Sequence, residues 1–210
     1  MKKDSHDKQL EEGIYIGNQV DKSNLSNPIS RKLVAGFDAE LLQALDRIQP
    51  KSLHEVGCGE GRLTRLIRDR YQIDVLASDF SEALIGENLQ GDCEGIDFRH
   101  LSIYDLNTED HRRSVVVCCE VLEHLEDPML GLRALRDLNA DHYIFSVPRE
   151  PIWRILNMLR LKYWSALGNT PGHLNHWSPR VFYRAVESSG FQVEEVLNPF
   201  PWIMVSLTAV

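Results

Sequence analysis

The chain has 210 residues, of which 43% are apolar, and its 31 acidic and 23 basic side chains give a net charge of −8. A chain of this length buries about 70% of its unfolded surface, so we expect one globular domain that needs no disulfide bonds to fold. The acidic balance argues against a general nucleic-acid-binding protein, because phosphate contacts are made by clustered Lys and Arg.

The cysteines and the first residues favour a cytoplasmic protein. Four cysteines occur, none in a C-x-x-C pair, namely Cys58, Cys93, Cys118 and Cys119, which indicates reduced thiols. Residues 1–12 are charged and lack the apolar stretch of a signal peptide. No apolar run approaches the ~18 residues of a membrane span, so we expect no transmembrane segment.

From about residue 50 onward, apolar runs alternate with helical patterns, which is typical of a parallel sheet with helices on both faces. The expected strands are Ser52–Val56, Ile73–Ala77, Ile96–Leu101, Val115–Cys119 and His142–Val147. Between them we expect a helix over Arg62–Arg70, one begun by Ser81 and one opened by Pro128. The run Val115–Cys119 is the most apolar and is predicted to be the central strand.

The two ends of the chain complete this pattern. Helical periodicity covers Pro151–Trp164 and Pro179–Ser189, and Gly190 ends the second helix. The strands Phe191–Leu197 and Ile203–Val210 follow without a helix between them, so they are predicted to form an antiparallel hairpin at the sheet edge. A further helix is expected over Arg31–Ile48.

The sequence therefore predicts a doubly wound α/β fold with a seven-stranded, mostly parallel sheet and an antiparallel last strand. Residues 1–50 are expected to form an amino-terminal helical cover. Residues 51–210 form the α/β domain, with a lid insertion at about residues 151–178.

A glycine-rich loop follows the first strand of the α/β domain, where an open parallel sheet binds its ligand. The loop reads Glu55-Val-Gly-Cys-Gly-Glu-Gly61. A dinucleotide-binding fingerprint needs its third glycine at position 62, but position 62 is Arg and the third glycine comes one residue earlier, at Gly61. Asp79 ends the next strand, where a carboxylate can bind both hydroxyls of a ribose. The alternative is a tight turn beside a solvated acid.

At these residues the chain resembles the class I S-adenosylmethionine-dependent methyltransferases. Residues 55–61 are similar to the first motif of that family and Ser78–Ser81 to the second. Val117–Pro128 resembles the fourth motif, in the form found in the ubiquinone-biosynthesis O-methyltransferase branch. The resemblance implies a Rossmann-like methyltransferase fold, an enzyme of the transferase class, and S-adenosylmethionine as its cofactor.

The resemblance also implies a set of cofactor-binding residues. They are Glu55, Gly57, Cys58, Gly59, Gly61, Asp79, Phe80, Ser102, Ile103, Cys119 and Glu120. Gly57 and Gly59 would lie against the methionine part, Asp79 would bind the ribose and Phe80 would lie against the adenine. Ser102 stands where an Asp commonly contacts the adenine amino group, and this departure weakens one contact. Cys118 and Cys119 are interpreted as small side chains that fill the core.

Carboxylates and imidazoles follow the fourth and fifth strands. On a helical turn Glu120 would share a face with Glu123 and His124, and a later loop carries His173 and His176. The pattern resembles metal-dependent O-methyltransferases, including those that modify the 3′ ends of RNA. That resemblance implies Mg²⁺ or Mn²⁺ on Glu120, Glu123, His124 and His173, lowering the pKa of an acceptor hydroxyl.

Two other interpretations of these histidines stay open. Without a metal, His124 or His176 is the candidate catalytic base, because imidazole changes its charge near neutral pH. Alternatively, the histidines only make structural hydrogen bonds.

Residues 151–186 contain no Asp or Glu but five basic residues, namely Arg154, Arg160, Lys162, Arg180 and Arg184. Residues 151–164 are also rich in Trp, Leu and Ile. Three interpretations remain open: a lid over the acceptor, extra core against the amino-terminal helix, or peripheral contact of residues 151–164 with a membrane.

The leading hypothesis is methyl transfer to an oxygen of a small, lipophilic acceptor, with nitrogen, sulfur and carbon acceptors still open. One alternative is a metal-dependent RNA 3′-end methyltransferase, against which the net charge argues. The other is a non-catalytic, cofactor-binding partner protein. The sequence leaves the oligomeric state open.

Overall fold

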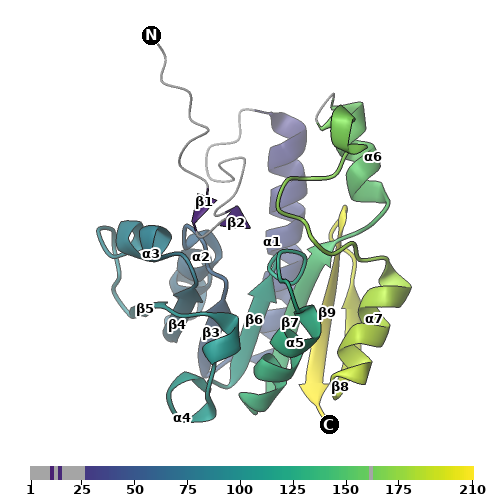
Figure 1. Cartoon of the computed structure of the whole chain (residues 1–210). Coiled ribbons are helices and arrows are strands. Elements are labelled where there is room, and N and C mark those ends of the chain that lie inside the picture. Colours follow the sequence, from purple (N-terminus) through teal and green to yellow (C-terminus); the bar gives the residue numbers. More distant parts are fainter. Residues whose placement is uncertain (1–9, 12–13, 16–26, 161–162) are drawn as a thin grey trace.

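The computed structural model describes residues 10–11, 14–15, 27–160 and 163–210 (Figure 1). Its main sheet has the strand order β5-β4-β3-β6-β7-β9-β8. These strands are β3 Ser52–Val56, β4 Asp74–Asp79, β5 Ile96–His100, β6 Val115–Cys119, β7 His142–Pro148, β8 Phe191–Leu197 and β9 Trp202–Ala209. Strands β3 to β7 pair in parallel, whereas β9 is antiparallel to both β7 and β8. The expected fold class, with its antiparallel hairpin at one edge, is confirmed.

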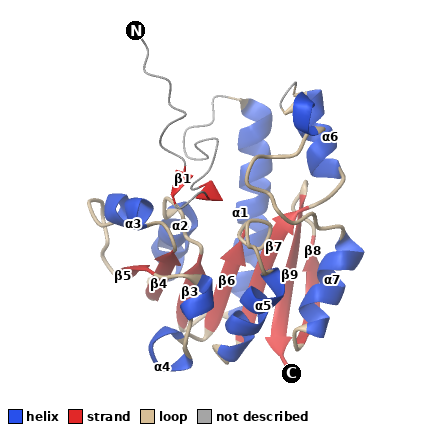
Figure 2. Ribbon diagram, in the orientation of Figure 1, coloured by secondary structure: helices blue, strands red, loops and turns tan. Residues whose placement is uncertain are grey.

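Helices cover both faces of this sheet (Figure 2). They are α1 Pro28–Ile48, α2 Arg62–Tyr71, α3 Glu82–Asn88, α4 Thr108–His111, α5 Pro128–Asp137, α6 Ile152–Leu159 and α7 Pro179–Ser188, with short 3₁₀ helices η1 Ile103–Asp105 and η2 Trp164–Ala166. Helix α1 begins three residues before the expected start, because the Asn27 side chain caps it and Pro28 suits a first helical turn. Among the described helices, none has both the length and the apolar character needed to cross a bilayer.

Two apolar clusters fill the space between the helices and the sheet. Helix α1 lies behind the sheet in Figure 1, where Phe37, Leu41 and Leu45 pack with Ile67 of α2. Helices α5 and α7 lie in front, and contribute Leu132, Leu135, Phe182 and Val186. Every residue of β6 is buried, as expected for the central strand.

Two expectations about the elements need correction. Strand β4 is Asp74–Asp79, displaced toward the carboxyl end from the expected Ile73–Ala77. Helix α6 ends at Leu159, not at Trp164, because side chains of α6 hydrogen-bond to the returning backbone at residues 167–168. In the expected helical cover, β1 Leu10–Glu11 and β2 Ile14–Tyr15 pair as strands, and residues 1–9, 12–13 and 16–26 lie outside the described residues.

The topology gathers the predicted site residues at one edge of the sheet. The glycine loop follows β3, which lies between β4 and β6, so Asp79 at the end of β4 and Glu120 after β6 flank that loop. This edge is where a doubly wound sheet binds its ligand.

Candidate active site

The glycine loop is held by the end of β4. The backbone N–H groups of Gly57 and Cys58 both donate to the Ser78 carbonyl, at 2.7 and 3.0 Å. Gly57 has a φ of +78°, and a Cβ there would lie 2.2 Å from Cγ2 of Val121, so only glycine fits. Gly59 also has a positive φ, but a Cβ there would meet no atom of the described residues within 4 Å. The loop is therefore closed toward Val121 and open at Gly59.

Asp79 is buried and joins the glycine loop to the start of α3. Its Oδ2 accepts a hydrogen bond from the Gly59 N–H at 2.8 Å, and its Oδ1 accepts from the Ser81 N–H at 2.9 Å. These two bonds fix the plane of the carboxylate, and each oxygen has further lone pairs that can accept from hydroxyl groups. The alternative of a solvated acid beside a turn is wrong, because Asp79 is only 8% exposed.

Asn88 and Arg65 support the loop from α3 and α2, and sequence reasoning missed both. Asn88 Nδ2 donates to the Gly59 carbonyl at 2.8 Å, and Arg65 Nη1 donates to Asn88 Oδ1 at 3.0 Å. A Cβ on Gly61 would lie 2.6 Å from Asn88 Oδ1, so this close approach also needs a glycine. No sequence signal links Asn88 to a loop so distant along the chain.

Glu55 and Cys58 are buried members of the same loop region. Thr64 Oγ1 of α2 donates a short hydrogen bond to Glu55 Oε2. Burial raises the pKa of Glu55 to about 7. Burial likewise raises the pKa of the Cys58 thiol, with the nearby Glu55 and Asp79 charges as further causes, so Cys58 stays protonated. Glu55 thus joins the end of β3 to α2, and its contact with a cofactor stays a prediction.

The residues expected at the adenine end lie at the carboxyl ends of β4 and β5. Phe80 is half-buried, and its carbonyl oxygen lies 2.8 Å from Nε2 of His100. Ser102 caps η1, since its Oγ accepts from the Tyr104 N–H at 3.2 Å. Ile103 is 6% exposed and packs into the cluster beneath α5. Their contacts with adenine stay predictions.

Glu120 lies apart from the expected metal group. Its backbone has a φ of +61°, and residues 122–124 form a turn, not a helix, so the predicted shared face with Glu123 and His124 is wrong. Glu120 Oε2 accepts from Trp202 Nε1 at 2.6 Å, and Oε1 accepts from Ser146 Oγ at 3.2 Å. Its carboxylate is therefore held by β9 and β7.

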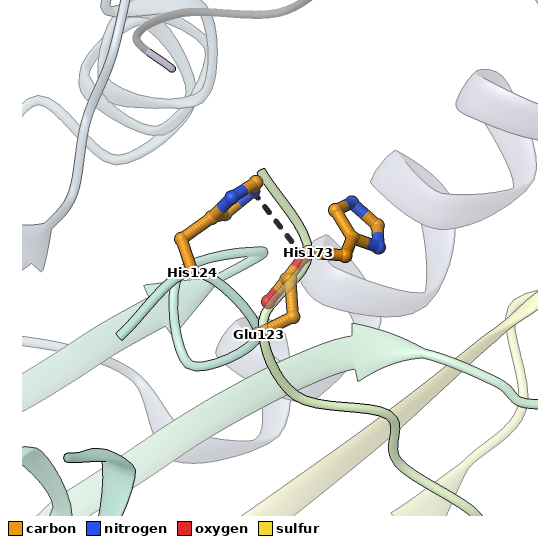
Figure 3. A group of neighbouring side chains, drawn as sticks. All are labelled: Glu123, His124 and His173. Atoms are coloured by element: carbon orange, nitrogen blue, oxygen red, sulfur yellow. Dashed lines mark ion pairs between the residues drawn. The ribbon is translucent and has the colours of Figure 1, made fainter. Parts of the chain in front are cut away.

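Glu123, His124 and His173 come together, as Figure 3 shows, with one potential ligand atom of each within 4.8 Å of the others. Nδ1 of His124 lies 2.9 Å from the Gly172 carbonyl oxygen, so it carries the proton and donates it. The lone pair of the neutral ring is then on Nε2, which lies 3.9 Å from Glu123 Oε1. The two imidazole rings are perpendicular, with centroids 4.9 Å apart. We call these three residues the triad.

The loop that carries His173 is bound to the turn that carries Glu123. The N–H groups of Leu174 and Asn175 both donate to the Glu123 carbonyl, at 2.8 and 3.0 Å. Asn175 Nδ2 also donates to the carbonyl of Leu125 at 2.6 Å. His124 Nδ1 also donates to the Gly172 carbonyl, and Asn175 Nδ2 also donates to the Leu122 carbonyl. These five hydrogen bonds join the two segments. The triad is assembled by backbone contacts that its sequence spacing does not reveal.

His176 lies outside the triad and pairs with a carboxylate that sequence reasoning missed. Its Nδ1 lies 3.8 Å from Oε1 of Glu150, and the imidazole is 40% exposed. Glu150 follows β7 and is 8% exposed, and burial raises the pKa of its carboxyl group.

Cys118 and Cys119 are both buried in the core, as expected.

Comparison with known proteins identifies the family. A family model described as a methyltransferase domain matches residues 31–196. The ubiquinone biosynthesis O-methyltransferase of Cereibacter sphaeroides is 34% identical over 113 residues, which cover 52% of this chain and 45% of that protein. The protein of the same name from Ruegeria pomeroyi is 27% identical over 191 residues, covering 83% of this chain and 74% of that protein. The chain spans about half the length of the first of these relatives.

Solved structures share the fold at low sequence identity. Magnesium protoporphyrin IX methyltransferase from Synechocystis PCC 6803, with bound SAH, has a TM-score of 0.66 and 17% identity, over 89% of this chain and 90% of that chain. Human N-acetylserotonin methyltransferase in complex with SAM also has a TM-score of 0.66, with 14% identity over 82% of this chain and 51% of that chain. Because the family model spans most of the sequence, the chain belongs to the methyltransferase-domain family, the expected family of S-adenosylmethionine-dependent methyltransferases.

Proposed function

We propose that the chain transfers the methyl group of S-adenosylmethionine to an oxygen of a small, lipophilic acceptor. The observation that carries this proposal is the contact between the two halves of the site. Gly57 of the glycine loop lies directly against Val121, two residues before Glu123 of the triad. A cofactor held by the loop would therefore lie close to the polar residues that follow β6.

The cofactor half fits a nucleoside with a free ribose diol. Asp79 is held by two N–H donors, so its orientation is fixed before the ligand arrives. A preorganised carboxylate loses little conformational entropy on binding. The open side of the loop at Gly59 lets a ligand approach the backbone closely.

The triad is proposed as a site for a divalent cation, with Mn²⁺ favoured. Two imidazoles with one carboxylate suit Mn²⁺ better than Mg²⁺, which prefers oxygen ligands. The 3.9 Å between His124 Nε2 and Glu123 Oε1 is too long for a hydrogen bond and agrees with two ligands of one ion. Because His124 Nδ1 donates a hydrogen bond to the Gly172 carbonyl, Nε2 is the atom that would bind the ion. When bound, the ion would lower the pKa of the acceptor hydroxyl.

His176 is the proposed proton acceptor, because His124 Nε2 is then occupied as a ligand. As the acceptor oxygen attacks, its bond to the methyl carbon forms while the carbon–sulfur bond breaks, and the electron pair stays on sulfur as S-adenosylhomocysteine. The hydroxyl proton passes to His176, whose Nδ1 lies 3.8 Å from Oε1 of Glu150. Since the sulfonium is already reactive, positioning is the main task of the remaining residues.

A screen of acceptors that measures S-adenosylhomocysteine tests the function. Lipophilic phenols should be methylated, and amines, thiols and RNA 3′ ends are parallel arms. Turnover of RNA with strong salt dependence would favour the RNA-end alternative. Cofactor binding without turnover in any arm would favour the non-catalytic alternative.

The cation is tested separately by calorimetry and electron paramagnetic resonance with Mn²⁺. The wild-type protein should bind Mn²⁺ and Glu123→Gln should bind it at least about tenfold more weakly. Glu126→Gln is the matched control, because Glu126 is exposed and lies two residues after the turn of residues 122–124. If the wild-type protein does not bind Mn²⁺, the cation proposal fails and His124 Nε2 becomes the candidate base.

A further inference from the structure

Four large apolar side chains are exposed on α6 and the turn that follows it. Ile155, Leu159, Trp164 and Leu167 are 52%, 75%, 57% and 65% exposed, and we call them the α6 surface. Ile155 and Leu159 are four residues apart, so they share one face of the helix. Trp153 of α6 instead contacts the rest of the protein, because its ring packs against Trp202 and stacks on His173.

The α6 surface belongs to a folded unit in which polar groups bond inward. Arg154 Nε donates to the Leu167 carbonyl and Asn157 Nδ2 to the Gly168 carbonyl, both at 3.0 Å. Trp164 Nε1 donates to the Met158 carbonyl at 3.1 Å, while its ring stays exposed. Gly168 allows the close return of the chain, because a Cβ there would lie 2.3 Å from the Arg154 carbonyl oxygen. The exposure of these side chains is thus fixed by local hydrogen bonds.

The sequence segment that contains the α6 surface has a charge opposite to that of the chain as a whole. Residues 151–186 contain no acidic side chain in a protein of net charge −8. Arg160 follows the last turn of α6 and is exposed. An exposed arginine beside exposed Trp and Leu complements an anionic surface with an apolar interior, where Trp is favoured at the boundary.

We propose that the α6 surface docks on an anionic phospholipid bilayer. Leu159 and Trp164 would enter the boundary between head groups and acyl chains, and Arg160 would lie among the anionic head groups. Helix α6 follows β7 at the edge that carries the triad (Figure 1). The rings of His173 and Trp153 of α6 stack, with centroids 6.3 Å apart. Docking would therefore bring the acceptor side of the protein to a membrane, where lipophilic molecules dissolve. The docking itself does not depend on the proposed methyl transfer.

Vesicle co-sedimentation without acceptor tests the proposal. The wild-type protein should bind vesicles of phosphatidylcholine mixed with phosphatidylglycerol, and bind pure phosphatidylcholine more weakly. Leu159→Gln should lower the partition coefficient by about tenfold or more, since a leucine no longer leaves water. Arg160→Gln should lower it by about fivefold at low salt. Leu130→Gln and Arg133→Gln are matched controls on α5, where both side chains are exposed, and should leave it unchanged.

A second measurement does not depend on these variants. Brominated lipids should quench a part of the tryptophan fluorescence that Trp164→Phe removes. The proposal is overturned if the protein does not bind anionic vesicles, or if the α5 variants weaken binding as much as the α6 variants. It is also overturned if light scattering shows a dimer that Leu159→Gln dissociates, because the surface then binds a second copy of the chain.

Discussion

Glu55→Gln tests the electrostatic cost of the buried carboxylate beneath the glycine loop. Burial raises the pKa of Glu55 from its ordinary value of 4.5 to about 7. The folded protein thus holds this proton more tightly than the unfolded chain does. The stabilising contribution is complete below pH 4.5 and is lost as the pH rises to about 7. A pKa difference of this size corresponds to about 3 kcal/mol.

Glutamine has the shape of the acid, cannot ionise and keeps an oxygen that accepts from Thr64. At about pH 8 we expect the free energy of unfolding of Glu55→Gln to exceed that of the wild-type protein by about 3 kcal/mol. For a chain of this length that raises the Tm by about 6–12 °C. At about pH 4 the two proteins should agree within about 0.5 kcal/mol.

Urea unfolding of the cofactor-free protein at both pH values measures this difference. Glu94→Gln is the control, because Glu94 is exposed, and it should show no dependence of this kind. An equal difference between Glu55→Gln and wild-type protein at both pH values would refute the desolvation argument.

Two further predictions concern the cofactor half of the site. Asp79→Ala should weaken S-adenosylmethionine binding by at least about 100-fold in calorimetry, because two hydrogen bonds to a charged group are worth about 1.5–3 kcal/mol each; unchanged affinity would contradict the ribose assignment. Gly57→Ala should lower the Tm more than Gly59→Ala does. Both positions have positive φ, but among the described residues only Gly57 has a close neighbour, because Val121 Cγ2 lies 2.2 Å from the added Cβ. Equal losses of stability would contradict the packing argument.

Much of the fold could be predicted because the strongest patterns report burial directly. The apolar run of β6 is buried on both sides, as its composition predicts. The sequence between β8 and β9 has no helical pattern, so an antiparallel hairpin was expected and is observed. The end of α6 could not be predicted, because apolar periodicity continues to Trp164. It is set by side-chain bonds from Arg154 and Asn157 to backbone carbonyls about a dozen residues away.

The site was predictable where a residue's place at a strand end determines its surroundings. The glycine loop and Asp79 follow from that rule, whereas the approach of His173 to Glu123 was expected only from the resemblance to metal-dependent O-methyltransferases. Glu120 could not be placed, because its positive φ is not visible in the sequence and turns its carboxylate toward Trp202. Glu150 and Asn88 were missed because their partners come from distant segments.

The position of β9 has a consequence for how the chain folds during synthesis. Strand β8 leaves the ribosome before β9, yet in the finished sheet it pairs with β9, which in turn joins it to β7. Until β9 arrives, the hydrogen-bonding edges of β7 and β8 are both exposed, which invites pairing with other chains. The exposed residues Gln192 and Glu194 on β8 include one charge that opposes such pairing. The pairing of β9 with β7 therefore joins distant parts of the chain and can form only after β9 has been made.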